Sequence, residues 1–323
     1  MNTGFHECRW RDFPPFFIGS DPDNPDVYTE WIRALPGPEP ALHYALNCVQ
    51  GGKKFIDVGA NVGLFTLATA RAGARVLAVE ALAKNYAILV QSIVKNQLEN
   101  VTPLYCAIFD HTGTLSMQGT SAWGQVAASQ SEQQIPCLTL DDLCSIYDFR
   151  NASVLKIDIE GSELAALSGA SDLLSQNTNM RIIFEANAYA SIAFGYHPRA
   201  LFRRCEEYGY QVYRILDDRL ALMASDAFQE SVCEDYAAVR KHAEQGVPGF
   251  ELPPLTLDER VEMVVLEATH AGGASRAYIY ASAAEMSEEI RSDERVSAAL
   301  ARLEDDADPG FCSAVDVFRS AVK

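Results

Sequence analysis

From Lys54 onward, short apolar runs alternate with segments that have the apolar spacing of helices, and this alternation constrains the fold most strongly. Five runs come first along the chain: FIDVG, RVLAVE, VTPLYCAIF, SVLKIDI and MRIIFEAN. The earliest are apolar almost throughout, which is typical of strands buried on both faces of a parallel sheet. The alternation therefore predicts βαβ units with helices on both faces of the sheet.

Two later apolar runs, QVYRIL and LALMAS, are separated only by the three residues DDR. A parallel crossover needs about a dozen residues or more, so these runs must form an antiparallel hairpin. The predicted fold class is therefore α/β. We expect a Rossmann-like, doubly wound, mostly parallel seven-stranded sheet with an antiparallel terminal hairpin strand, plus an α-helical C-terminal extension.

Changes in sequence texture divide the chain into three parts. Residues 1–50 hold the turn-rich stretches DPDNPD and PGPEP, so we expect an irregular segment that ends in a first helix. Residues 51–225 carry the strand and helix alternation. Residues 226–323 read as helices and hold 20 acidic and 9 basic residues, and thus 11 of the 18 net negative charges. Three interpretations of this extension stay open: a solvated helical appendage, a module for docking or homo-oligomer formation, or a segment that is partly disordered.

Charge and composition exclude several classes of function. The net charge of −18, without a basic cluster, disfavours nucleic acid and anionic membranes as partners. No apolar run approaches the roughly 18–20 residues of a membrane span. The eight cysteines are scattered without a C-x-x-C pair, which predicts reduced thiols rather than a zinc ribbon or a disulfide framework. With no signal-peptide pattern at the N-terminus, we expect a cytoplasmic protein.

The stretch KFIDVGANVGLFTLATA places a glycine turn between the first predicted strand and its helix. A dinucleotide turn has the pattern G-x-G-x-x-G, whereas Asn61 stands between Gly59 and Gly63 where a bare backbone would meet a pyrophosphate. Asp57 just before the turn would repel a phosphate and attract an ammonium group. The turn therefore favours a ligand that carries an amino group and lacks a phosphate.

Glu80 ends the second predicted strand, about 20 residues after the glycine turn. A carboxylate at this place can accept hydrogen bonds from both hydroxyls of a ribose. A nucleoside that bears an amino acid and no phosphate is S-adenosylmethionine. Together with the closing hairpin, which class I methyltransferases characteristically have, Glu80 points to that cofactor.

Five segments carry a family resemblance: FIDVGANVGLFTLATA, VLAVEALAKNYAILVQSIVKNQ, CLTLDDL, VLKIDIEGSELAALSGA and IIFEANA. Together they resemble FkbM-type methyltransferases, which are class I S-adenosylmethionine-dependent enzymes and mostly O-methyltransferases. The resemblance covers about residues 53–225, and LKIDIEGSE is its most specific part. Residues 51–225 are thus expected to form a class I methyltransferase domain.

The resemblance also implies a cofactor site. Its methionyl side would be formed by the turn and by the end of the fourth strand, namely Asp57, Gly59, Ala60, Asn61, Gly63 and Asp158. Glu80, followed by Ala81, would hold the ribose. The adenine would lie against Ala107, Ile108 and Phe109, at the end of the third strand.

An alcohol that accepts a methyl group must also lose a proton, so a base is expected at the carboxyl edge of the sheet. Asp158 and Glu185 are the favoured candidates and Glu160 is a third, because clustered buried carboxylates raise one another's pKa. Glu160 can equally be a first-turn helix residue. Three further residues are candidates for the substrate side, although each has an ordinary packing or helix-start role as its alternative: Trp123, Tyr189 and His197. No tight ligand motif indicates a metal.

The sequence thus predicts an O-methyltransferase that acts on a hydroxyl of a sugar, a glycan or a small natural product, with S-adenosylhomocysteine as its second product. Two alternatives stay open. A catalytically inactive methyltransferase-like scaffold would bind partners through residues 226–323. An NAD-dependent oxidoreductase would use the same kind of sheet, although the missing middle glycine and the terminal hairpin disfavour it.

Overall fold

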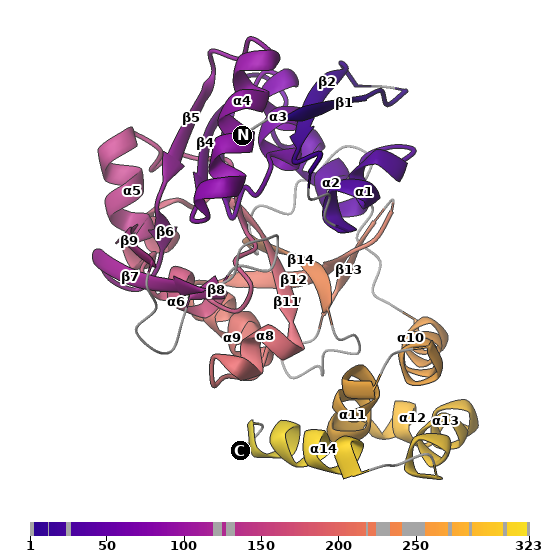
Figure 1. Ribbon diagram of the computed structural model, residues 1–323. Coiled ribbons are helices and arrows are strands. Elements are labelled where there is room, and N and C mark those ends of the chain that lie inside the picture. The colour runs from indigo at the N-terminus through magenta and orange to yellow at the C-terminus, as the bar shows by residue number, and fades with distance from the viewer. Residues whose placement is uncertain are drawn as a thin grey trace.

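The computed structural model describes most of the chain, and Figure 1 shows a central sheet flanked by helices. The described residues are 3–11, 13–23, 27–118, 125–126, 133–217, 219–223, 233–240, 256–270, 273–283, 286–305 and 309–321.

The central sheet has eight strands among these residues. Their order is β13 (Leu220–Leu222), β12 (Tyr210–Ile215), β14 (Cys233–Arg240), β11 (Arg181–Asn187), β10 (Val154–Ile157), β3 (Lys54–Val58), β4 (Arg75–Glu80) and β5 (Val101–Tyr105). The five strands from β5 to β11 pair in parallel, whereas β14 pairs antiparallel with both β11 and β12. The α/β class and the mostly parallel sheet are confirmed.

The antiparallel strand beside β11 comes from a segment that the sequence predicts to be helical. β12 and β13 form the expected hairpin, with Tyr213 opposite Leu222, but β13 lies at the edge of the sheet. β14 occupies the place between β11 and β12, so the sheet extends beyond residue 225 and has eight strands rather than seven. The apolar part of β14, residues 236–239, is short and lies between charged neighbours, so the acidity of the segment obscured its strand character.

Two hydrophobic clusters cover the two faces of the sheet because successive strand residues point to opposite sides. Phe55 belongs to the first cluster and Ile56 to the second. The first cluster packs under α2 (Pro40–Cys48), α3 (Leu64–Arg71) and α4 (Ala83–Lys95). The second packs under α5 (Leu140–Tyr147), α6 (Glu163–Ser168), α7 (Ser171–Gln176) and α9 (Arg199–Glu207).

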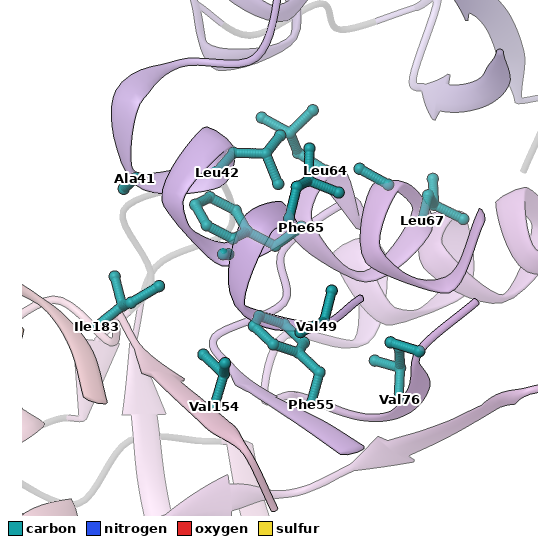
Figure 2. Close-up of a cluster of buried hydrophobic side chains, with 14 of the residues drawn as sticks. Ala41, Leu42, Val49, Phe55, Leu64, Phe65, Leu67, Val76, Val154 and Ile183 are labelled. Atoms are coloured by element: carbon teal, nitrogen blue, oxygen red, sulfur yellow. The ribbon is translucent and has the colours of Figure 1, made fainter. Parts of the chain in front are cut away.

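Figure 2 shows the first cluster, in which Phe55, Val76 and Val154 of the sheet lie beneath side chains of α2 and α3. Full burial of each large apolar side chain stabilises the fold by about 1.5–3 kcal/mol. This packing fixes α3, and with it the turn that precedes α3, against the end of the sheet.

Smaller elements surround the sheet. The N-terminal part contains a hairpin of β1 (Gly4–Cys8) and β2 (Phe16–Ser20), then α1 (Val27–Ala34), before the expected helix α2. The polar stretch after β5 forms a four-stranded sheet of β6 (Ala107–Ile108), β9 (Gln133–Leu138), β7 (Gly113–Gln118) and β8 (Gln125–Val126). The sequence predicts an irregular segment before the first helix, but the structure has a β-hairpin and the helix α1 there.

The C-terminal helices gather beyond α8 (Ala188–Ala193), as the orange to yellow helices α10–α14 of Figure 1 show. They are α10 (Leu257–His270), α11 (Gly273–Ser282), α12 (Glu288–Arg291), α13 (Glu294–Asp305) and α14 (Pro309–Ala321). Val264, Tyr278 and Phe318 form one buried cluster with Ala188 of α8, so these helices pack on the segment that follows β11. No described helix has the length and apolar character needed to cross a membrane.

Candidate cofactor and active site

The turn between β3 and α3 has a backbone that glycine favours. Gly59, Asn61 and Gly63 all have positive φ, at 80°, 52° and 105°. The N–H groups of Gly59 and Ala60 donate to the carbonyl oxygen of Val79 at 3.0 and 2.9 Å, which ties the turn to β4. A Cβ on Gly59 would lie 1.8 Å from the carbonyl oxygen of Asp158, so the chain directly after β10 lies against the turn.

Asp57 lies at the end of β3 and is 0% exposed. The Thr66 hydroxyl donates to its Oδ2 at 2.6 Å. Within the described residues its Oδ1 accepts no hydrogen bond, and the nearest cation is the Lys156 ammonium at 3.8 Å. Burial raises the pKa of Asp57, whereas Lys156 and Thr66 act to lower it. One carboxylate oxygen is therefore buried at the turn without a hydrogen-bond donor.

Glu80 lies at the end of β4, beside the same turn, and is 6% exposed. Its Oε2 accepts from the N–H of Asn61 and its Oε1 from the N–H of Leu82, both at 2.8 Å. Burial raises the pKa of Glu80 to about 7. Each oxygen keeps a second lone pair, so the carboxylate can hold the turn and also accept bonds from a hydroxylated ligand.

Substitution of Glu80 by alanine is expected to weaken S-adenosylhomocysteine binding by about 1–3 kcal/mol, because a buried acceptor at the turn is lost. Calorimetric titration measures the effect, and Glu99→Ala, which removes an exposed carboxylate, serves as the control. An affinity for Glu80→Ala equal to that of the wild type would refute the assignment of Glu80 to the ribose.

The fold brings together the three carboxylates that the sequence named as base candidates. Asp158, Glu160 and Glu185 each offer an oxygen, and these oxygens lie within 4.8 Å of one another. Asp158 and Glu160 follow β10, and Glu185 lies near the end of β11. The three side chains meet because neighbouring parallel strands end at the same edge of the sheet. The same spacing would suit a cation, and the expectation that the chain binds no metal stays a prediction.

The three carboxylates differ in their surroundings. Burial, followed by the negative charges of Asp158 and Glu163, raises the pKa of Glu160 to about 8. Burial, followed by the charges of Asp158 and Glu160, raises the pKa of Glu185 well above its ordinary value. Asp158 instead forms an ion pair with Lys156 at 3.0 Å. The cluster therefore combines a paired carboxylate with two whose protonated forms are favoured.

Glu163 holds the turn between Glu160 and α6. Its carboxylate accepts from the N–H groups of Ile159 at 2.9 Å and Gly161 at 3.0 Å, and from the Tyr196 hydroxyl at 3.2 Å. Glu160 itself adopts a positive φ of 53° in this turn. Glu163 is thus a structural residue that fixes the position of Glu160.

An apolar cluster lies beside Glu80. Leu82 and Ala107 are buried in it, and Ala81 and Phe109 pack against it. Ile108, the neighbour of Ala107 in β6, is buried in the second sheet cluster. The segments that the resemblance assigns to ribose and adenine therefore lie together, and their binding roles stay predictions.

The substrate-side candidates have different positions. The ring of Tyr189 packs against Phe318, with ring centroids 5.9 Å apart, and His197 stacks on Tyr278 at 6.1 Å. Both contacts join the segments that follow β11 to the C-terminal helices. Trp123 lies outside the described residues. The substrate roles of these three residues stay predictions.

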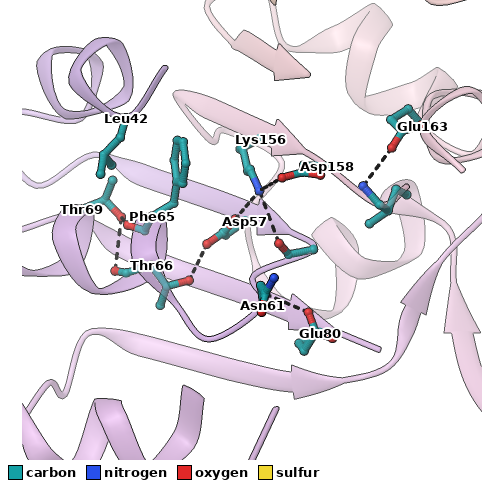
Figure 3. A network of polar contacts seen from close by, with 12 residues as sticks. Leu42, Asp57, Asn61, Phe65, Thr66, Thr69, Glu80, Lys156, Asp158 and Glu163 are labelled. Atoms are coloured by element: carbon teal, nitrogen blue, oxygen red, sulfur yellow. Dashed lines mark hydrogen bonds and ion pairs between the residues drawn. The ribbon is translucent and has the colours of Figure 1, made fainter. Parts of the chain in front are cut away.

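Sequence reasoning missed several charged or polar groups at this site. Lys156 lies between Asp57 and Asp158, as Figure 3 shows. Asp235 of β14 lies opposite Glu185 in the strand register. Tyr28 and Glu39, from the N-terminal part, interact electrostatically with Lys156. Only Lys156 had a sequence signal, because a charged residue inside a buried strand requires a partner.

Comparison with known proteins identifies the domain. Residues 57–212 match the family model described as the methyltransferase FkbM domain. Among curated proteins, none matches this chain.

Several solved methyltransferases are similar in structure. An O-methyltransferase from Bacillus cereus in complex with SAH is 18% identical, with 63% of this chain and 82% of that chain covered and a TM-score of 0.37. A precorrin-6y C5,15-methyltransferase from Geobacter metallireducens GS-15 is 13% identical, with 62% and 87% covered and a TM-score of 0.37. A SAM-dependent O-methyltransferase from Thermotoga maritima is 13% identical, with 67% and 71% covered and a TM-score of 0.37.

At such low identities and TM-scores these structures carry no information on the acceptor, and the assignment rests on the family model and the sequence motifs. Residues 57–212 of this chain form an FkbM-type methyltransferase domain, of the S-adenosylmethionine-dependent class that the motifs predict.

Proposed function

We propose that this chain is an O-methyltransferase whose acceptor is a hydroxyl group of a sugar, a glycan or another small molecule. The observation that supports O-methylation is the carboxylate cluster of Asp158, Glu160 and Glu185 beside the glycine turn. A hydroxyl needs a base for methylation, and carboxylates with a raised pKa provide one near neutral pH.

The residues of the turn fit S-adenosylmethionine. Two buried oxygens, Asp57 Oδ1 and Asn61 Oδ1, accept no hydrogen bond within the described part of the chain. An ammonium group satisfies such oxygens, and the methionyl end of the cofactor carries one. Glu80 can accept bonds from the ribose hydroxyls, and the cluster around Ala107 offers an apolar surface for the adenine.

When bound, S-adenosylmethionine supplies a methyl group on a positively charged sulfur. The chain's own residues hold the cofactor, exclude water and remove the acceptor's proton. Glu160 is the proposed proton acceptor, because its pKa of about 8 leaves it both partly ionised and basic near neutral pH. Asp158 is less suited to this role than the sequence suggested, because the Lys156 ammonium already occupies its Oδ2.

The proposal extends to partners and location. The net charge of −18 leaves a small molecule or a glycan as the expected acceptor, and nucleic acid is not expected. The acidic helices α10–α14 are proposed to dock a partner or a second copy of the chain. A cytoplasmic location is proposed from the reduced cysteines, six of which are buried.

The test is a transfer assay with the full chain. Methyl-labelled S-adenosylmethionine is incubated with a panel of hydroxylated sugars and polyketides, and with matched compounds in which an amine replaces the hydroxyl. We expect label in hydroxyl compounds together with an equal amount of S-adenosylhomocysteine. Transfer to the amines alone would contradict O-methylation. Cofactor binding without transfer to any member of a broad panel would favour an inactive scaffold.

A further inference from the structure

Lys156 is a buried cation in the middle of the central sheet. It belongs to β10, between β3 and β11, and is 5% exposed. Lysine is seldom buried to this extent unless its ammonium is paired. Figure 3 shows its Nζ where the ends of β3 and β10 meet the glycine turn.

Three oxygens surround this ammonium. Lys156 Nζ donates to Asp158 Oδ2 at 3.0 Å and to the Gly59 carbonyl oxygen at 3.3 Å, and it lies 3.8 Å from Asp57 Oδ1. The Phe65 ring is 5.0 Å away and covers another side. Burial acts to lower the pKa of Lys156, but the negative charges of Asp158 and Asp57 outweigh this effect. The pKa is therefore raised above its ordinary value and the side chain stays charged.

We propose that Lys156 is a positioning residue of the cofactor site, which holds Asp57, Gly59 and Asp158 together and keeps Asp57 ionised to receive the methionyl ammonium. This inference rests on the proposed use of S-adenosylmethionine. Lys156 lies outside the glycine-turn motif, yet its ammonium lies close to Asp57, Gly59 and Asp158 at once.

Packing alone does not require a charged side chain at position 156. A buried ion pair is often no more stabilising than apolar side chains of the same volume, and methionine would pack against Phe65. What an apolar residue cannot do is offset the negative charges around Asp57. Besides Asp57 and Asp158, the titratable groups that interact with Lys156 come from α1, β4, β14, the N-cap of α2 and the turn after β10: Tyr28, Glu80, Asp235, Glu39 and Glu160.

The excess of carboxylates determines how loss of the Lys156 charge changes the pKa of Asp57. Burial already raises the pKa of Asp57, and Lys156 opposes that rise. Without the ammonium the pKa of Asp57 rises further, so at low pH Asp57 is protonated and cannot attract a cation. As the pH increases through the new pKa, Asp57 ionises and binding recovers.

The experiment is calorimetric titration of the full chain with S-adenosylhomocysteine between about pH 6 and about pH 8. Lys156→Met is compared with the wild type at each pH, because protonation of the ligand itself affects both proteins equally and drops out of the ratio of their affinities. We expect affinity to fall by more than about 30-fold at pH 6 and by less than about 10-fold at pH 8. For Lys156→Arg, which retains the charge, we expect the ratio of its affinity to the wild-type affinity to be the same at every pH.

Lys54→Met is the matched control. Lys54 is also a strand lysine of this sheet, but its ammonium contacts Asp148 and Asn151 away from the turn. We expect its affinity to equal that of the wild type at every pH. If Lys156→Met does not fold, Lys156→Gln carries the same test, because it removes the charge and keeps a hydrogen-bond donor.

Three results would overturn the inference. A folded Lys156→Met with wild-type affinity at every pH would show that Lys156 does not position the site. A loss of the same size at every pH would indicate a purely structural role. A wild-type chain that does not bind S-adenosylhomocysteine would remove the proposed function, and this inference with it.

Discussion

Replacement of Gly59 by alanine is expected to destabilise the fold by more than about 3 kcal/mol and to abolish cofactor binding. The new Cβ would lie 1.8 Å from the Asp158 carbonyl oxygen, a distance that neither backbone can accept without moving. The residue would also keep a φ of 80°, which adds about 1 kcal/mol of strain for any side chain. Denaturant unfolding measures the loss of stability, and calorimetric titration with S-adenosylhomocysteine measures binding.

Gly73→Ala separates the two contributions. Gly73 follows α3 and has a φ of 93°, but a Cβ there meets nothing within 4 Å. This variant should lose only the strain of about 1 kcal/mol and should bind the cofactor as the wild type does. A Gly59→Ala variant as stable as Gly73→Ala would contradict the close approach of Asp158 to the turn.

Substitution of Glu160 by glutamine is expected to reduce kcat by about 10²–10⁴-fold on an identified hydroxyl acceptor, because the proposed proton acceptor is lost. Glutamine retains the volume and removes the basic oxygen. S-Adenosylhomocysteine affinity should change by less than about 5-fold, since other residues hold the cofactor. Steady-state kinetics and calorimetry together measure the two effects.

The pH dependence gives an independent readout. Because the pKa of Glu160 is raised to about 8, wild-type kcat should increase as the pH increases toward that value. Stability should follow the opposite course: a raised carboxyl pKa favours folding at low pH, and this contribution is lost as the pH increases from about 4.5 to about 8. Glu160→Gln should remove the kinetic trend and should reduce the stability trend, to which the raised pKa values of Glu80 and Glu185 also contribute. If Glu185→Gln removes the kinetic trend and Glu160→Gln does not, the base is Glu185.

The sequence was sufficient for the parts of the site that follow from local pattern. Gly59, Gly63 and Asp57 lie in one continuous motif, and their turn has the positive φ values that glycine favours. The meeting of Asp158 with Glu185 was also predictable, because parallel strands end at one edge of the sheet whatever the details of packing. Topology alone therefore placed these carboxylates near each other.

Contacts that depend on tertiary packing were not predictable. β14 enters the sheet next to β11 after a long excursion of the chain, and its charged ends gave no strand signal. Tyr28 and Glu39 act on the site from a segment that the motifs do not cover. The packing of Tyr189 against Phe318 likewise joins residues far apart in the sequence, although each is unremarkable in its own segment.

The central claim is that the turn from Asp57 to Gly63, with Glu80, holds S-adenosylmethionine rather than a dinucleotide. Calorimetric titration of the full chain with S-adenosylhomocysteine and with NAD tests it most directly. We expect saturable binding of S-adenosylhomocysteine that weakens in Glu80→Ala, and no binding of NAD at the same concentrations. Tight binding of NAD without a response to S-adenosylhomocysteine would contradict the claim.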